Sequence, residues 1–297
     1  SFDMADHYGP AELLTGSLVQ RLAETHDGEA RIQAFTKWVP EPGDMTPQLV
    51  RAAVDRARDR LSSRRVDLLQ FHWWDYLDPA YIDAMEQLAD LRNEGLVGNL
   101  GLTNFNTAHL RILLSLGIPI VSNQVHFSLL DARPEGEMTE LCREYGVKLL
   151  CYGTVAGGFF SERWLNAAEP ADEDVAGNWS LMKYLRFIRT AGGWDRFQKL
   201  LSTLSFVAGK HGVSIANVAV KWVLDQPAVA AVLVGTRLGI SDHSDDNERV
   251  FSFELDDDDR ARIEDARAAL RPIPGDCGDE YRKPPYLTAA GDLSHHD

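Results

Sequence analysis

Short apolar runs alternate with longer amphipathic segments along most of the chain. Apolar runs bounded by polar or glycine-containing stretches are typical of strands. The pattern predicts strands at residues 2–5, 31–38, 66–74, 97–104, 120–128, 147–154 and 229–236. These runs are apolar nearly throughout, as expected of a parallel sheet that is covered on both faces.

The segments between the runs carry apolar residues at helical spacing. Thr46 is suited to cap one helix, and Gly95, Gly117 and Gly146 are suited to end three others. Helices are predicted at residues 11–22, 46–61, 81–95, 106–117, 136–146, 194–212, 214–226, 241–250 and 256–270. Residues 155–193 are expected to form a long irregular insertion.

Strands that alternate with helices indicate an α/β fold with a parallel sheet. A doubly wound sheet is one such fold, but no predicted strand is followed by a Gly-x-Gly-x-x-Gly turn. Polar residues follow nearly every strand instead, where a (β/α)8 barrel builds its active site. The sequence therefore predicts a (β/α)8 TIM barrel as a single domain over residues 1–297. Residues 1–250 would form the barrel and residues 251–297 a C-terminal helix and tail.

Composition narrows the possible partners. The 297 residues are 44% hydrophobic and carry a formal net charge of −15, whereas nucleic-acid binding needs clustered Lys and Arg. No apolar stretch approaches the roughly 18 residues of a membrane span, and the first residues do not resemble a signal peptide. Three scattered cysteines predict neither a disulfide framework nor a zinc site. These features predict a cytoplasmic protein with no nucleic-acid or membrane partner.

Four side chains at strand ends are the main candidates for chemistry, although each has a structural explanation by itself. Asp3 can belong to a turn, and Tyr8 can belong to an aromatic wall. Lys37 can be a solvated rim charge, and His72 can be a core histidine whose hydrogen bonds are satisfied. The polar residues after the next two strands can cap the helices that follow.

Together these side-chain types can move a proton near neutral pH. A phenol with an ordinary pKa near ~10 is a poor acid at pH 7, but a nearby ammonium stabilises the phenolate. A carboxylate can orient and partly neutralise that ammonium, and a histidine can orient a carbonyl oxygen. Such a set protonates a developing alkoxide while a hydride reaches the carbon. Because no side chain supplies a hydride, a cofactor must do so.

Six motifs occur in order, each at a strand end: FDMADHYG, TKW, QFHWWDY, GNLGLTNFN, SNQVHF and CYGTVAGG. They resemble the successive signatures of the aldo-keto reductase family over residues 2 to about 250. Later segments such as GDCGDEYR are similar to a branch found in plants and bacteria. The resemblance implies hydride transfer from NADPH to an aldehyde or ketone, with Tyr8 as general acid, Lys37 and Asp3 tuning it, and His72 orienting the carbonyl.

The resemblance also implies a cofactor site. Thr103, Asn104 and Gln124 would bind the nicotinamide carboxamide, with Thr103 standing where serine is commoner, and Tyr152 would stack on the nicotinamide ring. The full set of implied cofactor residues is Thr103, Asn104, Gln124, Tyr152, Gly153, Thr154, Gly235, Arg237 and Asn247.

The segment after the last strand departs from the family pattern. The family presents Lys or Arg to the adenosine 2′-phosphate, whereas GTRLGISDHSDDN offers Arg237 and His243 among acidic residues. Arg237 is therefore the candidate phosphate ligand, near the start of a short helix. NADP is favoured over NAD on this ground.

The start of the sequence is the second departure. The first strand and helix that precede FDMADHYG in the family are absent, and seven units in place of eight would leave unpaired strand edges. A truncated sequence is the simplest explanation.

Aromatic residues follow the catalytic strand ends and are expected to line the substrate pocket. Trp73 and Trp74 are neighbours on a strand, so only one of them can face the interior. The predicted pocket residues are Trp38, Trp73, Trp74 and Tyr76.

Two other functions stay open at this point. One is a regulatory subunit that keeps the fold and the cofactor site without significant turnover. The other is a barrel enzyme with different chemistry, such as a hydrolase, although no metal-ligand cluster and no serine nucleophile elbow support it. The intact set of Asp3, Tyr8, Lys37 and His72 favours the reductase.

Overall fold

The computed structural model describes residues 1–25, 32–235, 239 and 242–282. The described chain divides into two compact units. The N-terminal unit holds residues 1–124 and 141–148, and the C-terminal unit holds residues 125–140 and 149–282. The expectation of a single domain over residues 1–297 stays a prediction.

Parallel strands in chain order build the sheet of the N-terminal unit. In the register, Lys37 pairs with Gln70, His72 with Thr103, and Thr103 with Gln124. Because the strands run the same way, the side chains at their carboxyl ends gather at one edge. The strands are β1 (Phe2–Asp3), β2 (Ala34–Trp38), β3 (Val66–His72), β4 (Val97–Thr103) and β5 (Ile120–His126), whose last two residues belong to the C-terminal unit.

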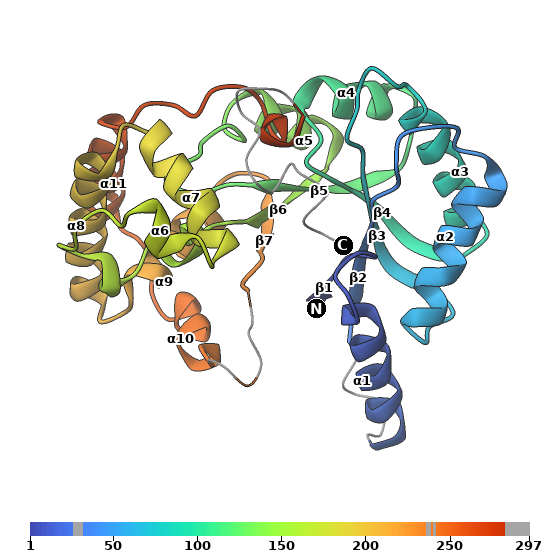
Figure 1. Ribbon diagram of the computed structural model, residues 1–297, viewed down its shortest axis with the longest axis horizontal. Coiled ribbons are helices and arrows are strands. Elements are labelled where there is room, and N and C mark those ends of the chain that lie inside the picture. The colour runs from blue at the N-terminus through green and yellow to red at the C-terminus, as the bar shows by residue number, and fades with distance from the viewer. Residues whose placement is uncertain (26–31, 236–238, 240–241, 283–297) are drawn as a thin grey trace. The chain divides into compact units, whose positions relative to one another are not determined.

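Helices connect these strands, and α2 and α3 lie beside β3 and β4 (Figure 1). Thr46 caps α2 as predicted, since its side chain accepts from the Leu49 amide. Gly95 and Gly117 follow α3 and α4 with φ of 83° and 79°, a region that favours glycine. The helices are α1 (Ala11–Thr25), α2 (Pro47–Arg60), α3 (Tyr81–Asn93), α4 (Thr107–Ser115) and α5 (Glu137–Tyr145), which is shared between the units.

The C-terminal unit continues the same order. Strand β6 (Lys148–Tyr152) pairs in parallel with β7 (Val229–Val232), and the Phe127 amide just after β5 donates to the Tyr152 carbonyl at 3.2 Å. The helices are α6 (Asp172–Val175), α7 (Trp179–Thr190), α8 (Trp194–His211), α9 (Ile215–Leu224), α10 (Ser244–Glu248) and α11 (Asp257–Ala268). The described part of this unit also contains the 3-10 turns η1 (Ala156–Gly158), η2 (Glu162–Trp164), η3 (Arg249–Phe251) and η4 (Asp279–Tyr281).

The expectation of an irregular insertion over residues 155–193 is wrong. This segment contains α6 and the 12-residue helix α7, which Asn178 caps by accepting from the Leu181 amide at 3.1 Å. The buried face of α7 includes Tyr184, Phe187 and Ile188. These positions recur at three- and four-residue spacing, so the helical period is present in this segment.

The fold is therefore α/β, with parallel strands that follow one another in chain order from β1 to β7. This order differs from that of a doubly wound sheet, in which the strand order reverses part-way. The fold class predicted from the sequence is confirmed in this respect.

Candidate active site

The carboxyl ends of β1 and β2 bring a carboxylate and an ammonium together. Lys37 Nζ forms an ion pair with Asp3 Oδ2 and also donates to the Met4 carbonyl at 3.0 Å. The Lys37 side chain is only 4% exposed and that of Asp3 19%. A buried ammonium is costly unless it is paired, so Asp3 both stabilises Lys37 and fixes its direction.

Tyr8 stands next to this pair, on the turn between β1 and α1. The Lys37 ammonium lies 5.2 Å from the centroid of the Tyr8 ring. The Tyr8 amide donates to the Ala5 carbonyl at 3.1 Å, which holds the turn, while the side chain is 47% exposed. The structure thus combines a reachable phenol with a buried cation on its ring face.

Two glutamines complete what we call the acid cluster, defined as Asp3, Lys37, Gln70 and Gln124. Gln70 Nε2 and Gln124 Nε2 both donate to Asp3 Oδ1, at 2.6 and 2.9 Å. Gln124 Nε2 also donates to Gln70 Oε1 at 2.7 Å. Gln124 was predicted from the resemblance as a carboxamide ligand, and the structure in addition joins it to the Asp3 carboxylate.

The sequence interpretation did not single out Gln70. The available signal was weak: a polar residue two positions before His72, and therefore on the same face of an otherwise apolar strand. Gln70 is fully buried in β3. A buried amide in that position needs hydrogen-bond partners, and these come from β1 and β5.

His72 ends β3 at the same edge of the sheet. It is 5% exposed, and its ring lies 4.4 Å from the Trp74 ring. Thr103, which pairs with His72 in the register, is also buried. Thr103 Oγ1 accepts and donates no hydrogen bond within residues 1–25, 32–235 and 242–282. Such a buried hydroxyl is suited to meet a polar group of a bound molecule.

Asn104 follows Thr103 with an unusual backbone. Its φ is 57°, in the left-handed region, and its amide donates to the Gln124 carbonyl at 2.8 Å. Asparagine tolerates this conformation better than most residues. The turn directs the chain away from β4 and leaves Thr103, Asn104 and Gln124 side by side.

The predicted aromatic pocket residues separate into two groups. Trp73 is fully buried, and the centroid of its ring lies 5.8 Å from that of Phe71. Its Nε1 donates to the Asp75 carbonyl at 2.6 Å. The Tyr76 ring stacks on His109 at 3.5 Å. Trp73 thus packs in the core and Tyr76 beside the start of α4, and their place in a substrate pocket stays a prediction. Trp38 and Trp74 flank Lys37 and His72 in the chain, and their place in a pocket stays a prediction.

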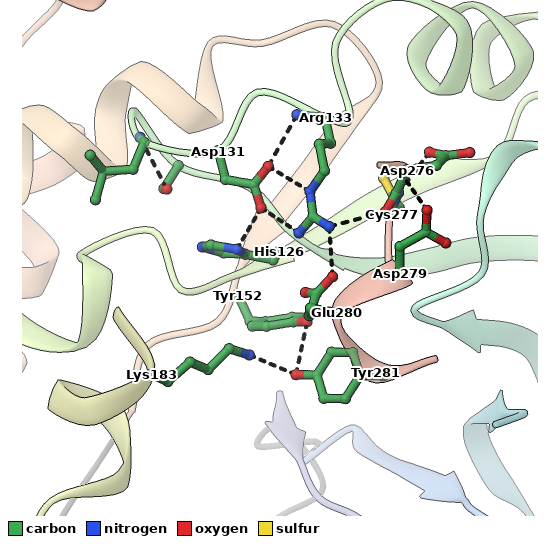
Figure 2. Close-up of polar contacts among 12 residues, drawn as sticks. His126, Asp131, Arg133, Tyr152, Lys183, Asp276, Cys277, Asp279, Glu280 and Tyr281 are labelled. Carbon is green, nitrogen blue, oxygen red and sulfur yellow. Dashed lines mark hydrogen bonds and ion pairs between the residues drawn. The ribbon is translucent and has the colours of Figure 1, made fainter. Parts of the chain in front are cut away.

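Tyr152, at the end of β6, lies in a polar and aromatic surrounding within the C-terminal unit (Figure 2). Its hydroxyl is 3.2 Å from that of Tyr281, to which Lys183 Nζ donates at 2.7 Å. Burial raises the pKa of Tyr152 well above its ordinary value, with Tyr281 and Glu280 acting in the same direction. This phenol stays neutral, which suits a stacking ring and not an acid.

Gly153 follows Tyr152 at a close approach that only glycine permits. Its φ is 72°, and a Cβ atom there would lie 2.3 Å from the Tyr184 hydroxyl. The same atom would lie 2.5 Å from His126. Thr154, the next residue, is buried.

Figure 2 also shows a cluster that the sequence interpretation missed, here called the anchor cluster: His126, Asp131, Arg133 and Glu280. Arg133 donates to Asp131 from Nε and Nη2 at 2.8 and 2.6 Å, and from Nη1 to Glu280 at 2.7 Å. Arg133 Nη1 also donates to the Asp276 carbonyl at 3.0 Å. The cluster thereby ties the segment Asp276–Arg282 to the loop after β5.

The positively charged side chains of the anchor cluster lower the pKa values of its two carboxyl groups. Burial would raise the pKa of Asp131, but Arg133 and His126 lower it well below its usual range. Burial acts on Glu280 in the same way, and Arg133 again lowers the pKa. The four side chains are no more than 4% exposed. His126 lies in SNQVHF and Glu280 in GDCGDEYR, but these segments do not indicate that the side chains meet, because they are far apart in the chain.

The sequence model of the aldo/keto reductase family matches residues 1–268. The chain belongs to this family.

Individual relatives support the assignment. The chain is 30% identical to a probable aldo-keto reductase of Glycine max over 79% of this chain and 66% of that protein. It is 29% identical to flagellar radial spoke protein 5 of Chlamydomonas reinhardtii over 54% of this chain, which spans only 33% of that protein. The structure of a glycerol dehydrogenase from Gluconobacter oxydans aligns with a TM-score of 0.74 at 23% identity, over 92% of this chain and 82% of that one. The fold is thus that of aldo-keto reductases.

The remaining residues implied by the aldo-keto reductase resemblance lie toward the end of the chain. Arg237 falls outside the described residues. Gly235 and Asn247 are exposed, and the Asn247 amide donates to the His243 carbonyl at 2.8 Å in α10.

The described residues contain no group of three or more His, Cys, Asp or Glu side chains that could hold a metal ion. No helix in the same part of the chain is long and apolar enough to cross a membrane.

Proposed function

We propose that this protein reduces an aldehyde or a ketone to an alcohol with NADPH. The observation that carries the proposal is the buried Lys37 ammonium, paired with Asp3 and placed on the face of the exposed Tyr8 ring. A cation in this position stabilises the phenolate that remains after proton transfer. The family assignment and the similarity to the probable aldo-keto reductase of Glycine max support the same reaction class.

Each residue of the site has one part in the reaction. NADPH supplies a hydride to the carbonyl carbon when it is bound. The Tyr8 hydroxyl gives its proton to the carbonyl oxygen, so the products are the alcohol and the oxidised cofactor. His72 orients the carbonyl oxygen, and Asp3 holds Lys37 against Tyr8. Solvent then returns a proton to the exposed Tyr8.

The residues present fit the nicotinamide end of the cofactor. Thr103 offers a buried hydroxyl that is not engaged within the described residues, with the polar side chains of Asn104 and Gln124 beside it. These three residues would hold the carboxamide. For Tyr152, in the C-terminal unit, stacking on the nicotinamide ring stays what the family resemblance implies.

The test follows NADPH absorbance with a panel of aromatic and short aliphatic aldehydes. Tyr8→Phe should lower kcat/KM by roughly 10²–10⁴-fold, because general acid catalysis contributes about that much. Tyr145→Phe is the matched control, since Tyr145 is a similarly exposed tyrosine on α5 and should leave turnover unchanged. Unchanged turnover in Tyr8→Phe would rule out the mechanism.

A second candidate function is a cofactor-binding subunit without significant turnover. The similarity to a flagellar radial spoke protein favours this alternative. Calorimetric titration with NADPH separates the two proposals, because tight binding without turnover of any aldehyde would support the subunit.

The preference for NADP over NAD rests on Arg237. Arg237→Ala should raise the KM for NADPH and leave that for NADH nearly unchanged, since only NADPH carries the 2′-phosphate. Equal effects on both cofactors would contradict the assignment.

A further inference from the structure

The hydrogen bonds of the acid cluster run in one direction. Asp3 is a carboxylate and can only accept, so both glutamines present their amide nitrogens to it. Gln70 thereby directs its own oxygen toward Gln124, whose nitrogen donates to it at 2.7 Å. The order of donation is therefore from Gln124 to Gln70 and from both to Asp3.

This order decides which way the Gln124 amide points. If the Gln124 amide were turned by 180°, its oxygen would face Asp3 Oδ1 and Gln70 Oε1. The Gln124 oxygen would then face two other acceptors in a buried place, and neither of its two hydrogen bonds could form. Each buried hydrogen bond left unmade costs about 1–3 kcal/mol. Gln124 Oε1 must point away from the cluster, where it takes part in no hydrogen bond among the described residues.

We propose that Gln70 is a positioning residue that, together with Asp3, fixes Gln124 as a hydrogen-bond acceptor toward the cofactor. The inference deepens the proposed function and rests on it. A carboxamide has one donor end, the NH₂ group, and one acceptor end, the carbonyl oxygen. A fixed acceptor at Gln124 selects the NH₂ end and so sets the orientation of the carboxamide.

Gln70 is suited to this role by its burial and its reach. It is fully buried, and both polar atoms of its amide are bonded. It stands opposite Lys37 on β2 and Gly101 on β4. A Cβ atom on Gly101 would lie 3.2 Å from Gln70 Cγ, so Gly101 leaves the space that this side chain occupies.

The experiment compares NADP⁺ with its 3-acetylpyridine analogue, in which a methyl group replaces the NH₂ group. Isothermal titration calorimetry measures the two dissociation constants. Wild type should bind the analogue about tenfold or more weakly, because the Gln124 oxygen would lose its donor. Gln70→Met keeps the length of the side chain and removes both polar atoms, so that Asp3 alone then holds the Gln124 amide. One of the two acceptors that oppose the turned amide is lost, and the ratio of the two constants should fall to about three or less.

Gln70→Asn is the second variant, because its amide is too short to bridge Asp3 and Gln124. It should lose the preference as well if Gln70→Met does not fold. Gln48→Met, an exposed substitution on α2, is the control and should keep the wild-type ratio. A merely structural role for Gln70 would weaken both ligands alike and leave the ratio unchanged.

Two outcomes overturn the inference: a wild type with equal affinities, or folded Gln70 variants with the wild-type ratio. Failure of the proposed function would look different, since neither NADP⁺ nor the analogue would bind and no aldehyde would be turned over.

Discussion

The acid cluster and the anchor cluster both bury charged side chains, but they satisfy them differently. In the acid cluster one lysine meets one carboxylate, and neutral amides from Gln70 and Gln124 supply the other hydrogen bonds. In the anchor cluster one arginine meets two carboxylates through its fork. The acid cluster therefore leaves one side of the Lys37 ammonium facing the Tyr8 ring, whereas the anchor cluster encloses the Arg133 guanidinium.

This difference follows from the chemistry of the two cations. An ammonium is a compact charge whose three donors can be shared between a carboxylate, a carbonyl and a nearby ring. A guanidinium is flat and rigid, and it binds carboxylates at fixed angles. We infer that the acid cluster serves proton transfer, whereas the anchor cluster fastens the segment Asp276–Arg282 to the loop after β5.

Removal of the lysine should have the largest effect on activity. Lys37→Met removes the ammonium that lies over the Tyr8 ring, and kcat/KM for aldehyde reduction should fall by roughly 10²–10⁴-fold. The melting temperature should change little, because the Asp3 carboxylate is partly exposed and keeps two amide donors. Lys199→Met on α8 is the control, with unchanged activity expected. A large loss of stability with full specific activity would reverse the assignment of the two clusters.

Removal of the arginine should have the largest effect on stability. Arg133→Met leaves two buried carboxylates without their cation, and the free energy of unfolding should fall by about 3–5 kcal/mol. Urea unfolding followed by fluorescence measures this difference. Arg51→Met is the matched control, because Arg51 forms an exposed ion pair with Glu94 and its loss should matter little.

The reactivity of the Cys277 thiol offers a second measurement on the Arg133→Met variant. Burial raises the pKa of the Cys277 thiol well above its ordinary value, so it should resist thiol reagents in wild type. If Arg133 holds the segment in place, the Arg133→Met thiol should react faster. Equal rates in the two proteins would show that other contacts fasten the segment.

The smallest effect on the free energy of unfolding is expected from Glu280→Gln, and it depends on pH. The pKa of Glu280 is lowered in the folded protein, so its ionised form contributes stability above the ordinary carboxyl pKa of about 4. That contribution is lost as the pH falls through the folded pKa. Glu280→Gln should therefore be less stable than wild type by about 1–3 kcal/mol at pH 7, with a gap that narrows below about pH 4. Urea unfolding at several pH values measures the gap, and a constant gap would contradict an ionic role.

Much of the fold could be predicted because its signals are local. The strands β2 to β6 begin and end within a few residues of the predicted positions. The caps at Thr46 and Ser214 and the glycines after α3 and α4 depend only on neighbouring backbone groups. Helix α7 was missed although its local signal is present, since its 12 residues carry buried side chains at helical spacing.

The acid cluster could be predicted in part. Asp3 and Lys37 stand at strand ends, and parallel strands place such ends at one edge. The register then pairs Lys37 with Gln70. The hydrogen bond between Gln124 and Asp3 could not be foreseen from spacing, because 121 positions separate them in the chain.

By itself, the sequence determined the alternation of strands and helices and the side chains that stand at the strand ends. Both depend on the periods of 2 and 3.6 residues and on capping, which act over a few residues. Only the tertiary structure decided which polar groups meet, as Arg133 and Glu280 do across 147 positions. The physical reason is that a hydrogen bond needs its two atoms within about 3 Å at a suitable angle, and this depends on strand register and loop path.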